Sequence, residues 1–174
     1  VRCLSGNAVW EAVANGTIDE GLLQAAVVPL EGSLVKRGNR SLMELAKEPT
    51  AMIVDYRDGF RASILTLNGA VNEWSVAWHE DGKTKATMFW TQEARPFMHF
   101  TYLVKGTEQM FHTGKPSWPA ERTLYTSAIL DAALISLKRG GTALPTPYLD
   151  IPYQSDWNWQ QPPPPPPGRP IHEK

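Results

Sequence analysis

The sequence has few of the features that mark several large classes of protein. Cys3 is the single cysteine among 174 residues, which excludes an internal disulfide framework and fits a reducing compartment. The formal net charge is −1, so the strongly basic composition expected of a protein that binds nucleic acid or an anionic membrane is lacking. No apolar run approaches the roughly 20 residues that cross a bilayer, and no basic-then-apolar signal peptide opens the chain. We therefore expect a cytoplasmic protein with no nucleic-acid and no membrane partner.

Sequence motifs for nucleotides and metals are lacking as well. No Gly-x-Gly-x-x-Gly turn follows a predicted strand. Gly114-Lys115 does not form a P-loop motif, because position 109 is Gln instead of the required glycine and Pro116 follows the lysine. The four histidines and Cys3 do not have the spacing of metal ligands. We therefore assign no catalytic, cofactor-binding or metal-binding residue to this chain.

The composition is otherwise that of an ordinary globular protein, with 42% apolar and 20% charged residues. A chain of this length can enclose one core, and we assign residues 1–155 to one domain. Residues 156–174 contain six consecutive prolines, which predict a disordered tail with polyproline-II character or, alternatively, a ligand for an aromatic groove. Val1 to Leu4 has the pattern of a strand already under way. We therefore expect an N-terminal part to precede Val1, and a processed start is the alternative.

The first part of the chain predicts short helices after this strand. A helix begins near Asn7, which we interpret as its N-cap. A second helix covers residues 19–28 and places four apolar residues on one face, namely Leu22, Leu23, Ala26 and Val27. Residues 31–39 have the composition of a loop. Ser41 and Glu44 have the spacing of a capping box, so a further helical turn opens at Ser41.

The centre of the chain changes to the two-residue period of β-strands. Strands are predicted over residues 51–56, 60–67, 72–80 and 84–91, and Asp-Gly pairs at 58–59 and 81–82 predict two hairpins. Trp74, Val76 and Trp78 share one face of the third strand, whereas its opposite face is more polar. We expect one four-stranded antiparallel sheet whose apolar face is covered by helices.

The last part of the chain returns to a helical period. Helices are predicted over residues 97–113 and 120–138, the second of which is stopped at Gly140-Gly141. A final strand is predicted over residues 148–153, where Pro152 suits an edge position. The fold class is therefore α+β, with an antiparallel, mixed-edge sheet and both helices packed on one of its faces.

Three residues are candidates for contact with a small-molecule substrate. His79 lies on the polar face of its predicted strand, where it is either a solvated residue or a substrate contact. Arg122 and Tyr125 lie in the first turns of helix 120–138. They either belong to ordinary helix-start chemistry or point into a cleft between two domains. Asp131, between apolar residues of the same helix, is either at the edge of an amphipathic helix or a buried carboxylate in need of a partner.

The order of elements and several segments resemble the second domain of the glucose–fructose oxidoreductase/inositol dehydrogenase (Gfo/Idh/MocA) family, and more closely an uncharacterised bacterial branch of it. The matching segments are Val1-Arg-Cys-Leu-Ser-Gly-Asn-Ala-Val-Trp, Asp55-Tyr-Arg-Asp-Gly-Phe-Arg-Ala, Leu67-Asn-Gly-Ala-Val and Thr113-Gly-Lys-Pro-Ser-Trp-Pro-Ala-Glu-Arg-Thr-Leu. They are spread over most of residues 1–153. None of them is a catalytic signature.

The resemblance implies a substrate-binding and oligomerisation domain of an NAD(P)-dependent oxidoreductase that acts on a sugar, a polyol or a related compound. The family's catalytic lysine, in a Glu-Lys-Pro-like segment, and its Asp-x-x-x-His helix have no counterpart in this chain. NAD or NADP would therefore be bound by an N-terminal nucleotide-binding domain outside it. The alternative is a non-catalytic binding or assembly domain that keeps the fold without redox activity.

The resemblance also implies a homo-oligomer through the open face of the sheet. The alternation of the predicted strands assigns a mixed apolar and polar surface to that face, and a two-fold interface requires such a self-complementary patch. The residues predicted to line it are Ser63, Leu65, Leu67, Ser75 and Ala77.

Overall fold

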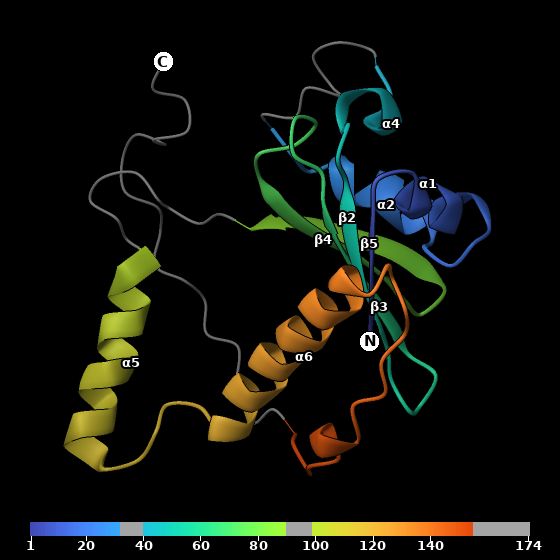
Figure 1. The fold of residues 1–174 in the computed structure, drawn as a ribbon. Coiled ribbons are helices and arrows are strands. Elements are labelled where there is room, and N and C mark those ends of the chain that lie inside the picture. The colour runs from blue at the N-terminus through green and yellow to red at the C-terminus, as the bar shows by residue number, and fades with distance from the viewer. Residues whose placement is uncertain (32–39, 90–98, 155–174) are drawn as a thin grey trace. The chain divides into compact units, whose positions relative to one another are not determined.

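The computed structural model of the chain describes residues 1–31, 40–89 and 99–154 (Figure 1). In these ranges five α-helices and two antiparallel sheets confirm the α+β class. The chain divides into two compact units, Val1–Phe89 with Ala128–Pro147, and Trp90–Ser127 with Tyr148–Lys174. The elements are, in order, β1 (Arg2–Ser5), α1 (Asn7–Ala14), α2 (Glu20–Val27), α4 (Leu42–Leu45), β2 (Thr50–Asp55), β3 (Arg61–Thr66), β4 (Trp74–Glu80), β5 (Lys83–Phe89), α5 (His99–Thr113), α6 (Ala120–Lys138) and a 3₁₀ turn over Pro147–Leu149.

A three-stranded sheet with the order β1-β2-β3 forms the centre of the first unit. The β2–β3 hairpin turns at Gly59, whose φ of 89° suits a residue without a side chain. In its register Ala51 lies opposite Leu65 and Ile53 lies opposite Ser63. Ala51 and Ile53 are fully buried among apolar residues of α1 and the α1–α2 loop. This face of the sheet is therefore the core face.

A second group of buried apolar side chains lies beside the first. It joins α1, α2, α4 and the turn after β3, and its members are Trp10, Leu23, Val27, Leu42, Leu45, Ala46, Leu67 and Ala70. Leu65 packs against both groups. Helix α2 begins at the N-cap Asp19, and α4 begins with the predicted capping box of Ser41 and Glu44, which is confirmed. Short helices of this length depend on such caps and on burial, because isolated helices are marginal in water.

The outer edge of β1 is closed by the C-terminal half of α6 and the segment after it. The Cys3 N–H donates to Ser136 Oγ at 2.9 Å, and Ser136 Oγ donates to the Thr142 carbonyl at 2.7 Å. Val1 and Leu144 exchange two main-chain hydrogen bonds of 2.9 and 2.8 Å. Ser136 has no exposed surface. The edge of β1 that β2 leaves open therefore obtains its hydrogen bonds from within the unit.

The β4–β5 hairpin is a separate two-stranded sheet against which α2 packs. Its turn has φ values of 51° at Asp81 and 71° at Gly82, as the predicted Asp-Gly turn requires. The hairpin is confirmed, but the prediction of one four-stranded sheet is wrong. After β3 the chain turns into the core. Leu67 and Ala70 belong to the second group of buried side chains and are 5% and 1% exposed. This turn ends the strand before β3 and β4 can pair.

Three other predictions are corrected in the first unit. Gly6 is the N-cap of α1, and Asn7 is its first helical residue, with Nδ2 donating to Glu11 Oε1 at 2.6 Å. Leu65 and Leu67, predicted with Ser63, Ser75 and Ala77 to line the open face of the sheet, pack in the core instead. The predicted buried face of β4 is also wrong, since Trp74 is 59% exposed. Two predicted segments lie mostly outside the described residues. They are the loop over residues 31–39 and the end of the last hairpin strand.

The second unit contains α5 and the beginning of α6. Ser117 Oγ donates to the Gly106 carbonyl at 2.5 Å. Trp118 lies so close to Gly106 that a methyl group there would meet its ring at 3.2 Å. The bounds of α6 are confirmed and α5 ends as predicted, whereas residues 97–98 lie outside the described residues. Whether α5 covers a sheet stays a prediction, because it belongs to the other unit.

The predicted strand over residues 148–153 is wrong. The structure has a 3₁₀ turn over Pro147–Leu149 and no strand after it up to residue 154. Two prolines remove main-chain donors from this segment. The Tyr125 hydroxyl lies 2.9 and 2.8 Å from the carbonyl oxygens of Leu149 and Ile151, which share its single O–H donor. The predicted proline-rich tail lies outside the described residues.

Candidate functional site

His79 is part of an exposed polar contact between β4 and α2. Its Nε2 lies 3.5 Å from Asp19 Oδ2, and its Nδ1 lies 3.2 Å from the Thr84 hydroxyl. The Asp19 carboxylate also accepts from the Leu22 N–H at 2.8 Å. That main-chain hydrogen bond, with a smaller contribution from His79, lowers the pKa of Asp19 below its usual value. Both side chains are about half exposed, with fractions of 56% and 51%. His79 thus joins two elements of the fold and remains accessible to solvent.

Arg122 and Tyr125 lie on the first turns of α6, in the second unit. The Arg122 guanidinium is 5.3 Å from the centroid of the Trp118 ring, which is a cation–π distance. The Tyr125 hydroxyl is engaged by the two carbonyl oxygens of the 147–153 segment, and its ring lies 5.7 Å from that of Tyr153. Arg122 is exposed. His79 belongs to the first unit, whereas Arg122 and Tyr125 belong to the second.

Asp131 is exposed, which agrees with its interpretation as a residue at the edge of an amphipathic helix. The buried residues of α6 are Ala132, Ala133 and Ser136. The carboxylate of Asp131 therefore needs no buried partner.

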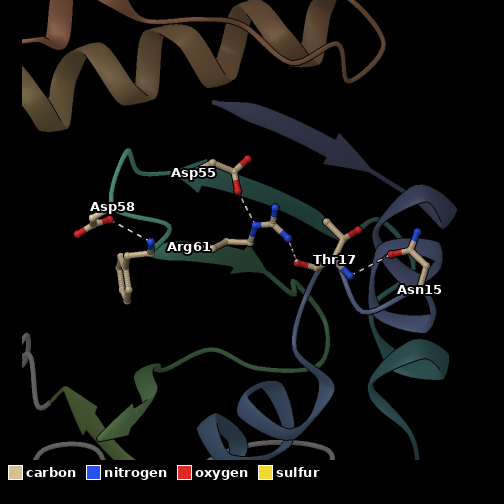
Figure 2. Close-up of polar contacts among 6 residues, drawn as sticks. Asn15, Thr17, Asp55, Asp58 and Arg61 are labelled. Carbon is tan, nitrogen blue, oxygen red and sulfur yellow. Dashed lines mark hydrogen bonds and ion pairs between the residues drawn. The ribbon is translucent and has the colours of Figure 1, made fainter.

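Polar contacts hold the α1–α2 loop against the β2–β3 hairpin, as Figure 2 shows. Arg61 Nε donates to Asp55 Oδ1 at 2.5 Å, and another guanidinium nitrogen donates to the Thr17 carbonyl at 3.3 Å. The Thr17 N–H in turn donates to Asn15 Oδ1 at 3.0 Å. Arg61 and Asp55 are directly opposite each other in the sheet register. The exposed ion pair of Arg61 and Asp55 therefore holds the α1–α2 loop in place. The two charges are paired with each other, so neither points to a ligand site.

The hairpin's outer face, which we define by Trp74, Val76 and Phe89, was predicted to be buried but is open. These side chains are 59%, 38% and 53% exposed. Trp74 and Phe89 lie directly opposite each other, as do Val76 and Thr87. Because side chains alternate along a strand, His79 lies on the other face, where it contacts the N-cap of α2. Helix α2 therefore covers the more polar face of the hairpin and leaves the apolar one open.

Charged side chains occupy the tip of the same outer face. Glu80 lies opposite Lys83, and Trp78 lies opposite Lys85. Lys85 forms an ion pair with Glu80. The outer face is thus apolar at its base and carries both signs of charge at its tip. The alternation of tryptophan and valine in the sequence signals this face, but it does not say which face a helix covers.

The junction of β1 and α1 does not fit a dinucleotide cofactor. Gly6 lies at the junction of β1 and α1, where a Rossmann fold places its glycine-rich turn. It is the single glycine of that junction, and its N–H donates to the Pro49 carbonyl at 2.9 Å. A pyrophosphate group needs several free main-chain N–H groups at such a turn. We therefore derive no chemical step through NAD or NADP from these residues.

Among residues 1–31, 40–89 and 99–154, no group of three or more His, Cys, Asp or Glu side chains is placed to hold a metal ion. No helix in the same ranges is long and apolar enough to cross a membrane. The Cys3 thiol is buried, and burial raises its pKa above the usual value. The Cys3 side chain therefore has the environment of a structural thiol.

Comparison with known protein families, with curated proteins and with solved structures finds no match to this chain.

Proposed function

We propose that this chain is a substrate-binding and oligomerisation domain of a Gfo/Idh/MocA-like, NAD(P)-dependent oxidoreductase. The observation that supports its assembly role is the hairpin's outer face, where two large aromatic side chains are more than half exposed. Exposed apolar patches of this kind mark interaction surfaces. The α+β architecture and the resemblance of the quoted segments support the rest of the proposal.

The partner that fits the hairpin's outer face is a second copy of this chain. A two-fold axis parallel to the strands places β4 of one copy over β5 of the other at the same level. Trp74 then meets Phe89 of the second copy, and Glu80 meets Lys83 of the second copy. An axis perpendicular to the strands would instead place the aromatic base over the charged tip. Charge and polarity therefore select the parallel arrangement.

The area of the hairpin's outer face sets a limit on this interface. Buried aromatic side chains contribute about 150–250 Å² each, whereas a stable interface buries roughly 800 Å² on each partner. The outer face is therefore the centre of the proposed interface, and neighbouring surface completes it. A non-catalytic assembly domain would use the same face, so assembly alone does not separate the two functions.

Nucleotide binding separates the oxidoreductase from the assembly domain. In the proposal, a domain that precedes Val1 binds the nicotinamide nucleotide and this chain supplies the substrate side of the site, for which Arg122, Tyr125 and His79 remain candidates. We expect residues 1–174 alone to bind neither NADH nor NADPH in titration calorimetry. A dissociation constant near 1 μM or tighter, which corresponds to about −8 kcal/mol, would contradict that expectation.

The same titration on the polypeptide extended upstream of Val1 tests whether the proposed upstream domain binds the nicotinamide nucleotide. Binding of NADH or NADPH by the extended chain supports the oxidoreductase. If the extended chain assembles but binds no nucleotide, the non-catalytic assembly domain is the correct alternative. Sugars and polyols added to the nucleotide complex then test the substrate class by their effect on the nicotinamide absorbance.

A further inference from the structure

The chain contains two Asn-Gly pairs, Asn15-Gly16 and Asn68-Gly69, which the structure holds in different ways. An asparagine followed by glycine is chemically reactive, because glycine has no side chain to keep its main-chain nitrogen away from the asparagine amide. The reaction requires that this nitrogen be free and that the asparagine side chain be able to turn toward it.

Both groups of the first pair are engaged. Asn15 Oδ1 accepts a hydrogen bond from the Thr17 N–H at 3.0 Å, as Figure 2 shows. The Gly16 N–H donates to the Val13 carbonyl at 3.1 Å, at the C-terminal end of α1. The reacting carbon and nitrogen are therefore held apart by two hydrogen bonds.

In the second pair, the asparagine side chain and the glycine N–H both lack a hydrogen-bond partner within the described ranges. The Ala70 N–H donates to the Leu67 carbonyl at 3.0 Å, which closes a four-residue turn around Asn68 and Gly69. Gly69 has a φ of 88° and Asn68 does not have a positive φ, a combination that defines a type II turn. The main-chain N–H groups of the two central residues take no part in the closing bond of such a turn. Neither the Gly69 N–H nor the Asn68 side chain has a hydrogen-bond partner among residues 1–31, 40–89 and 99–154, and Asn68 is exposed.

We propose that Asn68-Gly69 is a site of spontaneous deamidation in the folded protein. The Gly69 nitrogen, after losing its proton to solvent base, attacks Asn68 Cγ and forms a five-membered succinimide ring. The side-chain carbon–nitrogen bond breaks, and ammonia leaves with a proton from water. A water molecule then opens the ring at either carbonyl and leaves aspartate or isoaspartate at position 68. The net reaction consumes one water and releases one ammonia, with no change of oxidation state.

The product affects the fold because the turn lies against the core. Leu67 and Ala70, on either side of the reacting pair, are 5% and 1% exposed. A methyl group on Gly69 would meet the Leu45 carbonyl oxygen at 3.1 Å, which shows how closely the turn packs. Isoaspartate inserts one additional carbon into the main chain of this turn. Leu67 and Ala70 then cannot both keep their positions, and the melting temperature of the modified chain falls.

The test follows both sites in one sample. The native protein is incubated at mildly alkaline pH, and peptide mapping by mass spectrometry measures deamidation at Asn15 and Asn68. A parallel sample unfolded in urea gives the rates without structure. We expect similar rates in urea, and in the folded protein a rate at Asn68 about tenfold above that at Asn15, because two hydrogen bonds protect Asn15. An isoaspartyl methyltransferase, used as a reagent, identifies isoaspartate at position 68.

The control is the Asn68→Gln variant, whose side chain would have to close a larger ring and reacts more slowly. Its melting temperature should stay constant during the incubation, while the melting temperature of the parent should fall in proportion to the isoaspartate formed. Equal rates at Asn15 and Asn68 in the folded protein would overturn the proposal. So would an Asn68 that is protected by folding as strongly as Asn15.

Discussion

The Ser136→Ala substitution tests how the edge of β1 is held. Ser136 is fully buried, accepts from the Cys3 N–H at 2.9 Å and donates to the Thr142 carbonyl at 2.7 Å. Alanine removes both hydrogen bonds. Thr142 is exposed, so its carbonyl can bind water instead, whereas the Cys3 N–H stays buried without an acceptor. The cost therefore arises mainly at Cys3.

The magnitude follows from two opposing terms. A buried donor left without a partner costs about 1–3 kcal/mol. Alanine favours the helix over serine by roughly 0.5 kcal/mol. We expect Ser136→Ala to lower the free energy of unfolding by about 1.5 kcal/mol, compared with the 5–15 kcal/mol typical of whole domains.

Urea unfolding followed by circular dichroism measures this loss, and Ser127→Ala is the matched control. Ser127 lies in the same helix and is exposed, so its replacement should change stability by no more than about 0.5 kcal/mol. Amide hydrogen exchange at Cys3 supplies a local measurement and should accelerate in the Ser136 variant alone. If the two variants are equally stable and exchange at Cys3 alike, Ser136 does not satisfy the edge of β1.

Two further predictions concern single turns of the first unit. The lowered pKa of Asp19 means that its carboxylate stabilises the fold above the usual carboxyl pKa, and that this contribution is lost as the pH falls through the folded-state pKa. Asp19→Asn keeps an N-cap without the charge, so its urea midpoint should lie below that of the parent at neutral pH and approach it in acid; parallel pH profiles would refute this role. Gly82→Ala places a side chain on a φ of 71° and should cost about 1 kcal/mol, while Lys83→Ala next to it should cost less. Equal costs at both positions would show that the backbone of the turn carries no strain.

Local rules predicted much of the fold. Both Asp-Gly hairpins, the Ser41 capping box, the α2 helix and the bounds of α6 follow from signals within a few residues. Asn7 shows the limit of such a rule, because Gly6 adopts the N-cap position one residue earlier.

The pairing of the hairpins could not be predicted in this way. It depends on Leu67 and Ala70, which turn into a core built from α1, α2 and α4. The alternation along β4 distinguishes its two faces but does not say which one a helix covers. The N-cap Asp19 of α2 contacts His79, on the more polar face. The predicted strand near Pro152 was wrong because the hydroxyl of Tyr125, 26 residues away from Ile151, binds its carbonyl. Contacts between distant parts of the chain therefore decide which candidate residues are accessible.

Sedimentation equilibrium of the Trp74→Glu variant at tens of micromolar tests the proposed assembly most directly. Met43→Glu is the matched control, because Met43 is 57% exposed on α4 and Trp74 is 59% exposed on the hairpin's outer face. We predict a discrete dimer for the parent and for Met43→Glu, and a monomer with unchanged circular dichroism for Trp74→Glu. A monomeric parent, or a dimer that persists in Trp74→Glu, would contradict assembly through this face.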